Sequence, residues 1–92
     1  MKLDMKSITV VLNVFAESQE LDKVASTIAN LPEAIDVYEV TGEYDVVALV
    51  ESEDIASFRE FLKNKILSIN GVKSTVTAVI LHTHKKDGKI GF

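Results

Sequence analysis

The chain has 92 residues, of which 47% are hydrophobic and 26% are charged, so it can form one domain around a hydrophobic core. Ten basic and fourteen acidic residues give a formal charge of −4, which disfavours binding to nucleic acid or to an anionic membrane through overall charge. The absence of cysteine excludes disulfides, thiol catalysis and cysteine-ligated metal sites. No apolar run approaches the ~18 residues of a membrane span, and no cleavage site follows the N-terminus. We therefore expect a soluble, cytoplasmic, single-domain protein.

The first expected element is a strand at 7–15, where β-branched and aliphatic residues follow one another almost without interruption. One face of this strand is wholly apolar and the other is mixed, which predicts full burial on one side and partial cover on the other. A helix is expected over 18–31, capped by Ser18 and ended by Pro32. Its apolar stripe is formed by Leu21, Val24, Ala25 and Ile28.

Two further strands are expected at 34–41 and 44–51, separated by Gly42 and Glu43. A glycine followed by any residue favours the tight type II′ turn that joins antiparallel strands. This segment is therefore interpreted as a β-hairpin.

The last expected elements are a helix over 54–69 and a strand over 72–83. Ser52 or Asp54 can cap the helix, and Gly71 closes it where the chain turns left-handed. The tail 84–92 is polar and contains glycine, and it is a candidate for disorder.

The pattern β-α-β-β-α-β is an internal repeat, because matching apolar positions recur at offsets of 34 to 37 residues. Two such units interleave into a ferredoxin-like α+β fold, a four-stranded antiparallel sheet with both helices on one face. The other face of the sheet is not polar enough to lie in water. We therefore expect a dimer packed sheet against sheet, an α/β sandwich.

The hairpin with the sequence VTGEYDVV is a candidate binding site for a zwitterion. Free amides around Gly42 favour a carboxylate, and Asp45 offers a carboxylate to an ammonium group. Hydroxyls from a neighbouring strand or subunit can complete the pocket, and the candidates are Ser74, Thr75 and Thr77. The same residues also fit a plain turn glycine, a turn-stabilising aspartate and ordinary strand formers.

The charge pattern favours a cationic or zwitterionic ligand over a phosphate. Between Lys23 and Arg59 there is no basic residue but there are eight acidic ones, namely Glu33, Asp36, Glu39, Glu43, Asp45, Glu51, Glu53 and Asp54. The alternative interpretation is a solvated acidic rim that keeps the protein in solution.

Other chemistry is weakly represented. His82 and His84 lie on one face of a strand, but no third ligand is identifiable by spacing, so no metal site and no cofactor are predicted. Lys85, Lys86 and Lys89 are interpreted as a solvated terminus. A small cofactor-free oxygenase could use Tyr38, Tyr44 and the two histidines, and this enzyme stays an alternative.

The stretch 31–83 resembles the C-terminal effector domain of the Lrp/AsnC family of transcriptional regulators. The residues that carry the resemblance are LPEAIDVYEVTGEYDVVALVES, then ILSINGV, then KSTVTAVIL. These strings occur in that family in this order and at this spacing, and the match in elements covers about four-fifths of the chain.

The resemblance implies a RAM domain, which has the βαββαβ fold, dimerises through its sheets and often forms octameric rings of four dimers. It also implies that an amino acid binds where dimers meet, near the hairpin. By position, Gly42, Glu43, Tyr44 and Asp45 would form the hairpin part of that site, with Ser74, Thr75 and Thr77 on the last strand.

The chain departs from full-length regulators because only six residues precede the expected first strand. This leaves no room for a helix-turn-helix, so we expect a stand-alone module without direct contact to DNA or membrane. We expect a non-enzymatic amino-acid sensor that self-associates and can co-assemble with full-length regulators. A ligand-free oligomerisation domain is the remaining alternative.

Overall fold

The computed structural model describes residues 7–91 of the chain. Its elements are β1 (Ile8–Ala16), a 3-10 turn (Ser18–Glu20), α1 (Leu21–Ala29), β2 (Ala34–Glu39), β3 (Val46–Ser52), α2 (Ile55–Phe61) with a π-helical continuation (Leu62–Ile66), β4 (Val72–Val79), β5 (Lys85–Lys86) and β6 (Lys89–Ile90).

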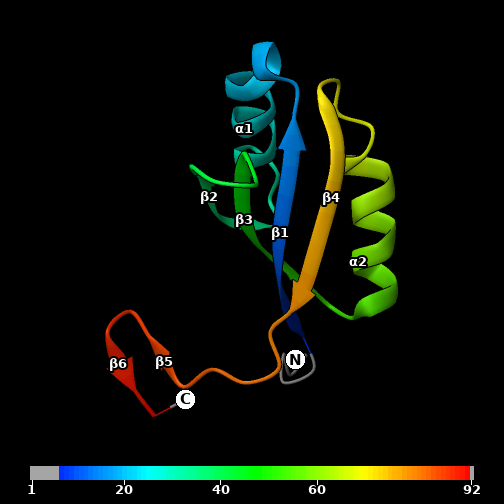
Figure 1. Cartoon of the computed structure of the whole chain (residues 1–92). Helices are drawn as coiled ribbons and strands as arrows, with labels where there is room; N and C mark the ends of the chain where they lie inside the picture. Colours follow the sequence, from blue (N-terminus) through cyan, green and yellow to red (C-terminus); the bar gives the residue numbers. More distant parts are fainter. Residues whose placement is uncertain (1–6, 92) are drawn as a thin grey trace.

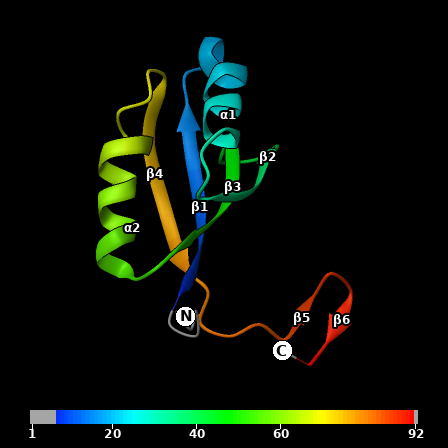
Figure 2. The same cartoon turned by 180° about the vertical axis from the view of Figure 1, so that it is seen from behind.

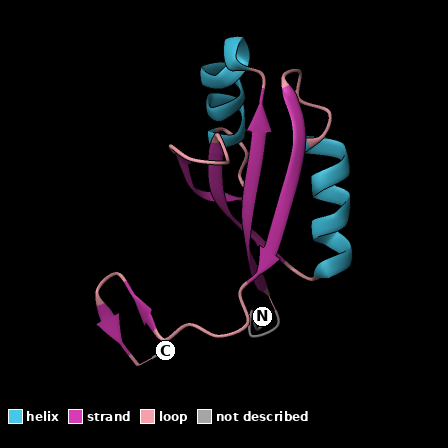
Figure 3. Ribbon diagram, in the orientation of Figure 1, coloured by secondary structure: helices cyan, strands magenta, loops and turns pink. Residues whose placement is uncertain are grey.

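The first four strands form one antiparallel sheet in the order β2-β3-β1-β4, as Figures 1 and 3 show. Both helices lie on the same face of this sheet, which is clearest from behind in Figure 2. This arrangement confirms the ferredoxin-like α+β fold predicted from the repeat. Neither helix of the described chain covers the second face of the sheet.

The core lies between the sheet and the helices because alternate strand residues point to that side. Every second residue of β1 is buried, from Val10 to Ala16, and so is every second residue of β3, from Val46 to Val50. The helices contribute the other buried side chains, namely Val24, Ile28, Phe58, Phe61 and Ile66.

The two helices begin differently from one another. Asp54 caps α2, and its Oδ1 accepts a hydrogen bond of 2.7 Å from the Ser57 amide, as predicted. The cap predicted at Ser18 is wrong, because a 3-10 turn precedes α1 and no side chain caps that turn or the helix. Gly71 has φ +103 after the second helix, as expected from its sequence.

The connection between β2 and β3 is longer than the predicted two-residue turn. The strands end at Glu39 and resume at Val46, and the Val40 amide donates to the Asp45 carbonyl at 3.0 Å. Gly42 has φ +106, which glycine adopts readily. The loop 40–45 is therefore closed at its base, and the backbone groups of residues 41–44 form no hydrogen bond with the backbone of another described residue.

The tail also differs from expectation. Where the sequence made 84–92 a candidate for disorder, β5 and β6 pair into a hairpin, with Lys85 opposite Ile90 and Lys86 opposite Lys89. Asp87 and Gly88 both have positive φ (52 and 78), which is the backbone of a two-residue type I′ turn. An Asp-Gly pair between two short strands was a hairpin signal that the polar composition of the tail obscured.

Candidate functional site

Asp45 fastens the loop 40–45 to the end of β1. Its Oδ2 accepts a hydrogen bond of 2.8 Å from the Ala16 amide, and its own amide donates to the Val14 carbonyl at 3.0 Å. Asp45 is half-buried there. The side chain therefore has a structural role, because it holds together two segments that lie 29 residues apart.

The same carboxylate keeps its charge available. No lysine, arginine or histidine of the described residues forms an ion pair with Asp45, whereas Glu60 pairs with Arg59 and Glu33 with Lys65. One carboxylate oxygen can therefore bind the β1 amide while the negative charge attracts an ammonium group.

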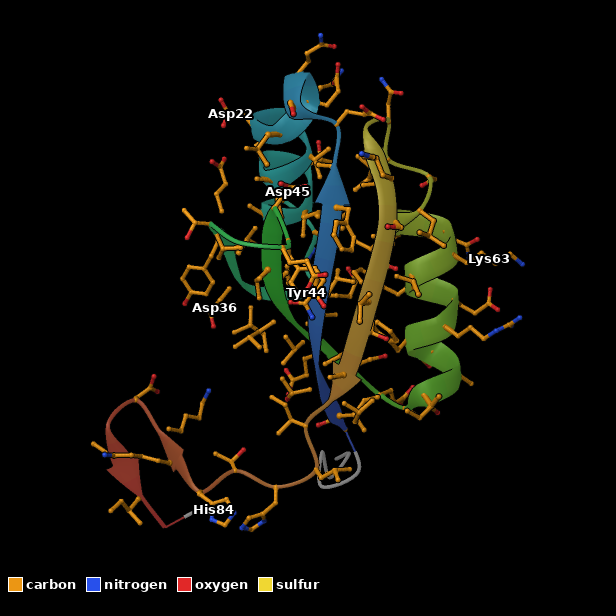
Figure 4. All side chains as sticks on the ribbon, viewed as in Figure 1. Asp22, Asp36, Tyr44, Asp45, Lys63 and His84 are labelled. Carbon is orange, nitrogen blue, oxygen red and sulfur yellow. The ribbon has the colours of Figure 1, made fainter. Side chains whose placement is uncertain are left out.

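Tyr44 lies on the open face of the sheet and packs on Phe15 of β1 (Figure 4), with ring centroids 5.0 Å apart and planes tilted by 56°. Ser74 is opposite Phe15 in the β1–β4 register, so its side chain shares this face. Gly42 and Glu43, in the loop itself, are exposed. The structure thus groups the loop, an aromatic pair and one hydroxyl residue at one end of the open face.

Thr75 and Thr77 do not join this group within one chain. They are opposite Val14 and Leu12, whose side chains are fully buried toward the helices. Because residues directly opposite in a ladder share a face, these two threonines belong to the helix side of β4. From the sequence, all three hydroxyl residues were candidates for one pocket. Ser74 and Thr75 are adjacent in β4, however, so their side chains lie on opposite faces of the sheet.

The open face itself is largely apolar. Val11 on β1 is flanked by Leu49 on β3, and further out Tyr38 on β2 and Val76 on β4 are 55% and 47% exposed. Asn13 lies among them, with its side-chain amide donating to the Val76 carbonyl at 3.1 Å. This is the surface for which the sequence predicted a second sheet.

Sequence reasoning missed Phe15 and the Ala16 amide as parts of the site. Both belong to β1, far from the hairpin string, and nothing in the local pattern indicates that they meet it. The adjacency of β1 and β3 in a ferredoxin-like sheet was the available signal, because it brings the end of β1 to the beginning of β3.

Two carboxyl groups outside this site have shifted pKa values. A hydrogen bond with the Asp22 carboxyl raises the pKa of Glu39, and some loss of solvent adds to the effect. A hydrogen bond from Lys65, whose Nζ lies 2.8 Å from Oε2, lowers the pKa of Glu33. Acidic side chains therefore lie against one another at the β2–α1 edge, whereas Glu33 has a cation.

The two histidines are not near the loop. His82 and His84 stack edge to face, with centroids 4.7 Å apart, and Figure 4 shows His84 on the projecting tail and Tyr44 on the sheet. Within residues 7–91, no three side chains of the metal-binding types gather in one place. The described helices are also too short or too polar to cross a membrane.

The protein-family model described as the Lrp/AsnC ligand binding domain matches residues 9–90 of this chain. Among curated proteins, the HTH-type transcriptional regulator FL11 of Pyrococcus horikoshii is 38% identical over 73 residues, which are 79% of this chain and 48% of that protein. The HTH-type transcriptional regulator Ptr1 of Methanocaldococcus jannaschii is 26% identical over 83 residues, 90% of this chain and 56% of that protein. The chain spans about half the length of the curated relatives it matches.

Solved structures show the same fold. TTHA0845 from Thermus thermophilus has a TM-score of 0.80 at 32% identity, and the match covers 86% of this chain and 99% of that one. AsnC from E. coli has a TM-score of 0.78 at 23% identity, covering 83% and 52%. The regulator NMB0573 from Neisseria meningitidis, whose structure is a complex with L-Met, has a TM-score of 0.82 at 20% identity, covering 91% and 56%.

Proposed function

Because this chain belongs to the Lrp/AsnC ligand-binding domain family, in which it is a regulatory domain homologous to transcriptional regulators, we propose that it binds a free amino acid at the loop 40–45. The observation that carries the proposal is the position of Asp45, a half-buried carboxylate without a cation among the described residues, beside a glycine loop and an aromatic pair.

Each part of the group suits one part of an amino acid. The amides of the loop around Gly42 offer donors to the α-carboxylate, and the charge of Asp45 attracts the α-ammonium. The Tyr44–Phe15 pair offers an apolar surface to a side chain, with the Ser74 hydroxyl beside it. Thr75 and Thr77 could take part only from a different copy of the chain, because they lie on the opposite face of β4.

Self-association is the second part of the proposal. The open face of the sheet supports a dimer packed sheet against sheet, and dimers can assemble further into a ring of four. An amino acid that binds where dimers meet has different affinities for the separate and the assembled states, and only this difference can shift the assembly.

The acidic surface supports the proposal that this domain does not itself contact DNA. Residues 7–80 contain twelve acidic and five basic side chains, and such a surface repels phosphates. Regulation would then pass through co-assembly with full-length regulators of the family. A gel-shift assay at low salt, with and without the ligand, tests for direct binding.

The first prediction concerns the ligand. Calorimetric titration of protein of known oligomeric mass with each of the twenty amino acids, L-methionine included, should give saturable binding for one or a few of them. Asp45→Asn should weaken that binding by tenfold or more, because asparagine keeps an acceptor for the Ala16 amide but loses the charge that attracts the ammonium.

Asp45→Ala is the matched variant, because it loses both the acceptor and the charge. It should also lower the free energy of unfolding by about 1–3 kcal/mol, since the half-buried Ala16 amide loses its partner. If Asp45→Asn binds the amino acid like the wild type, the side chain has only its structural role. Silence across all twenty at millimolar concentration would contradict the sensor and leave a ligand-free oligomerisation domain.

A further inference from the structure

Residues 81–91 form an arm that leaves the body of the domain. The Ile80 amide donates to the Thr9 carbonyl at 2.9 Å and so extends the β1–β4 pairing by one residue. Beyond it, β5 and β6 pair with each other, and the views in Figures 1 and 2 both show this hairpin clear of the sheet and the helices.

This arm has the character of a segment that binds another surface. Each of its strands has two residues, and an isolated two-stranded hairpin is marginally stable in water. Its apolar side chains are also unprotected, because Leu81 is 94% and Ile90 is 81% exposed. Contact with a second surface would bury them and add stability to the hairpin.

Charge indicates which surface the arm fits. The arm carries Lys85, Lys86 and Lys89 against one acidic residue, Asp87, whereas the body 7–80 has a formal charge of −7. The arm is therefore a basic segment beside an acidic body, and the charge of that body is complementary to it.

The acidic edge of the body is formed by Asp36 and Glu39 on β2 and by Asp22 on α1. Asp36 is opposite Leu49 and so lies on the open face, whereas Glu39 is opposite the buried Val46 and lies on the helix side of β2. There Glu39 shares a hydrogen bond with Asp22, which raises its pKa. None of the three has an ion pair with another described residue. The edge therefore presents negative charge that no cation of the described chain neutralises.

We propose that the arm of one copy binds the acidic edge of a second copy, and that the second copy returns the same contact. This inference rests on the sheet-to-sheet dimer of the proposed function. The arm starts from β4, at the opposite side of the sheet from β2. Six extended residues from Leu81 to Lys86 span about 20 Å. This length exceeds the ~15 Å width of four strands at their usual spacing, so the arm is long enough to cross a sheet of this size.

The test compares dimer dissociation constants by analytical ultracentrifugation at low salt. The arm variant carries Lys85→Glu, Lys86→Glu and Lys89→Glu, and the edge variant carries Asp36→Lys and Glu39→Lys. Each should weaken the dimer about tenfold, the scale expected for several exposed ion pairs, and the weakening should shrink at high salt. The two variants mixed together, or combined in one chain, should recover much of the lost affinity.

Lys63→Glu is the control for reversing a lysine charge elsewhere on the protein, because Lys63 lies on the exposed side of the second helix, away from the arm (Figure 4). It should leave the dissociation constant within about twofold of the wild type. An arm variant that dimerises like the wild type overturns the arm contact but leaves the sheet dimer in place. A wild type that stays monomeric contradicts the proposed self-association itself.

The same arm variant also tests whether the partner of the arm is a second copy of the chain or a different polyanion. Binding of the wild type to a DNA duplex or to phosphatidylserine vesicles, lost in the arm variant while the dimer is unchanged, would assign the lysines to a different partner and overturn the proposal.

Discussion

Asp22 and Glu39 are a carboxyl pair whose mutual repulsion affects stability. Their hydrogen bond raises the pKa of Glu39 above its unfolded value, so the folded protein binds a proton there more readily than the unfolded chain does. The stabilisation from that proton is present at low pH and is lost as the pH rises through the raised pKa. Above that pKa the repulsion between the two carboxyl groups works against the fold.

We therefore expect Asp22→Asn to raise the unfolding temperature at pH 7. The difference from the wild type should shrink as the pH falls through the raised pKa of Glu39, because protonation then removes the repulsion in the wild type too. Thermal unfolding followed by circular dichroism between pH 3 and pH 8 measures this difference, at a fixed protein concentration.

Asp36→Asn is the control, since it removes one charge from the same strand but not from this pair. If both variants give the same pH profile, the effect belongs to the general acidic charge of the domain. If Asp22→Asn is less stable than the wild type at pH 7, the hydrogen bond outweighs the repulsion.

The turn between α2 and β4 is the element most dependent on one residue. Gly71 has φ +103, and its carbonyl accepts a hydrogen bond of 2.8 Å from the Glu17 amide at the end of β1. A Cβ at this position would lie 2.5 Å from Cβ of Glu20 and 3.1 Å from Cγ2 of Val24. The turn therefore packs against the beginning of the first helix at a distance that only glycine permits.

Gly71→Ala should lower the free energy of unfolding by about 2–4 kcal/mol, because backbone strain and the clash with Glu20 add together. Gly42→Ala is the matched control. Its φ is +106, yet nothing lies within 4 Å of the added Cβ, so it should cost only the backbone part, about 1 kcal/mol. Urea titrations give both values, and equal losses would show that the contact with Glu20 relaxes without cost.

Features of secondary structure that depend on a few neighbouring residues could be predicted from the sequence. Asp54 caps its helix and Gly71 turns the chain, because capping and positive φ are local properties. Ser18 fails as a cap because the chain enters a 3-10 turn there instead. The hairpin at Asp87 and Gly88 has a local turn signal, an Asp-Gly pair, but it lies in a short polar segment whose composition is typical of disorder.

At the scale of the molecule, no helix of the described residues covers the second face of the sheet. That face combines Val11 and Leu49 in the middle with Val76 toward one edge, and a sheet with three or more strands usually buries such a face. The dimer proposed here would cover it, and a charge placed in its centre would then oppose assembly.

Val76→Glu should weaken the dimer at least tenfold while leaving the monomer folded, because the side chain is 47% exposed in a single chain. Ile55→Glu removes an apolar side chain that is 58% exposed at the start of the second helix, so it serves as the control. Size-exclusion chromatography with light scattering reports the mass of each. If both variants behave alike, the open face is not the interface.

The sequence by itself determined the order and type of the six main elements, four strands and two helices, and the fold. Alternation along β1, the apolar stripes of the helices and the internal repeat are periodic signals, and burial of apolar side chains admits few ways to combine them. It also indicated the family, since the strings that carry the resemblance lie within the matched region.

Only the tertiary structure decided which side chains meet. The contact of Asp45 with the Ala16 amide, the packing of Tyr44 on Phe15 and the separation of Ser74 from Thr75 and Thr77 all depend on strand register. Register brings together residues that are distant along the chain, and a shift by one residue moves a side chain to the opposite face. Local patterns carry no information about such pairs, so the site became specific only in the folded sheet.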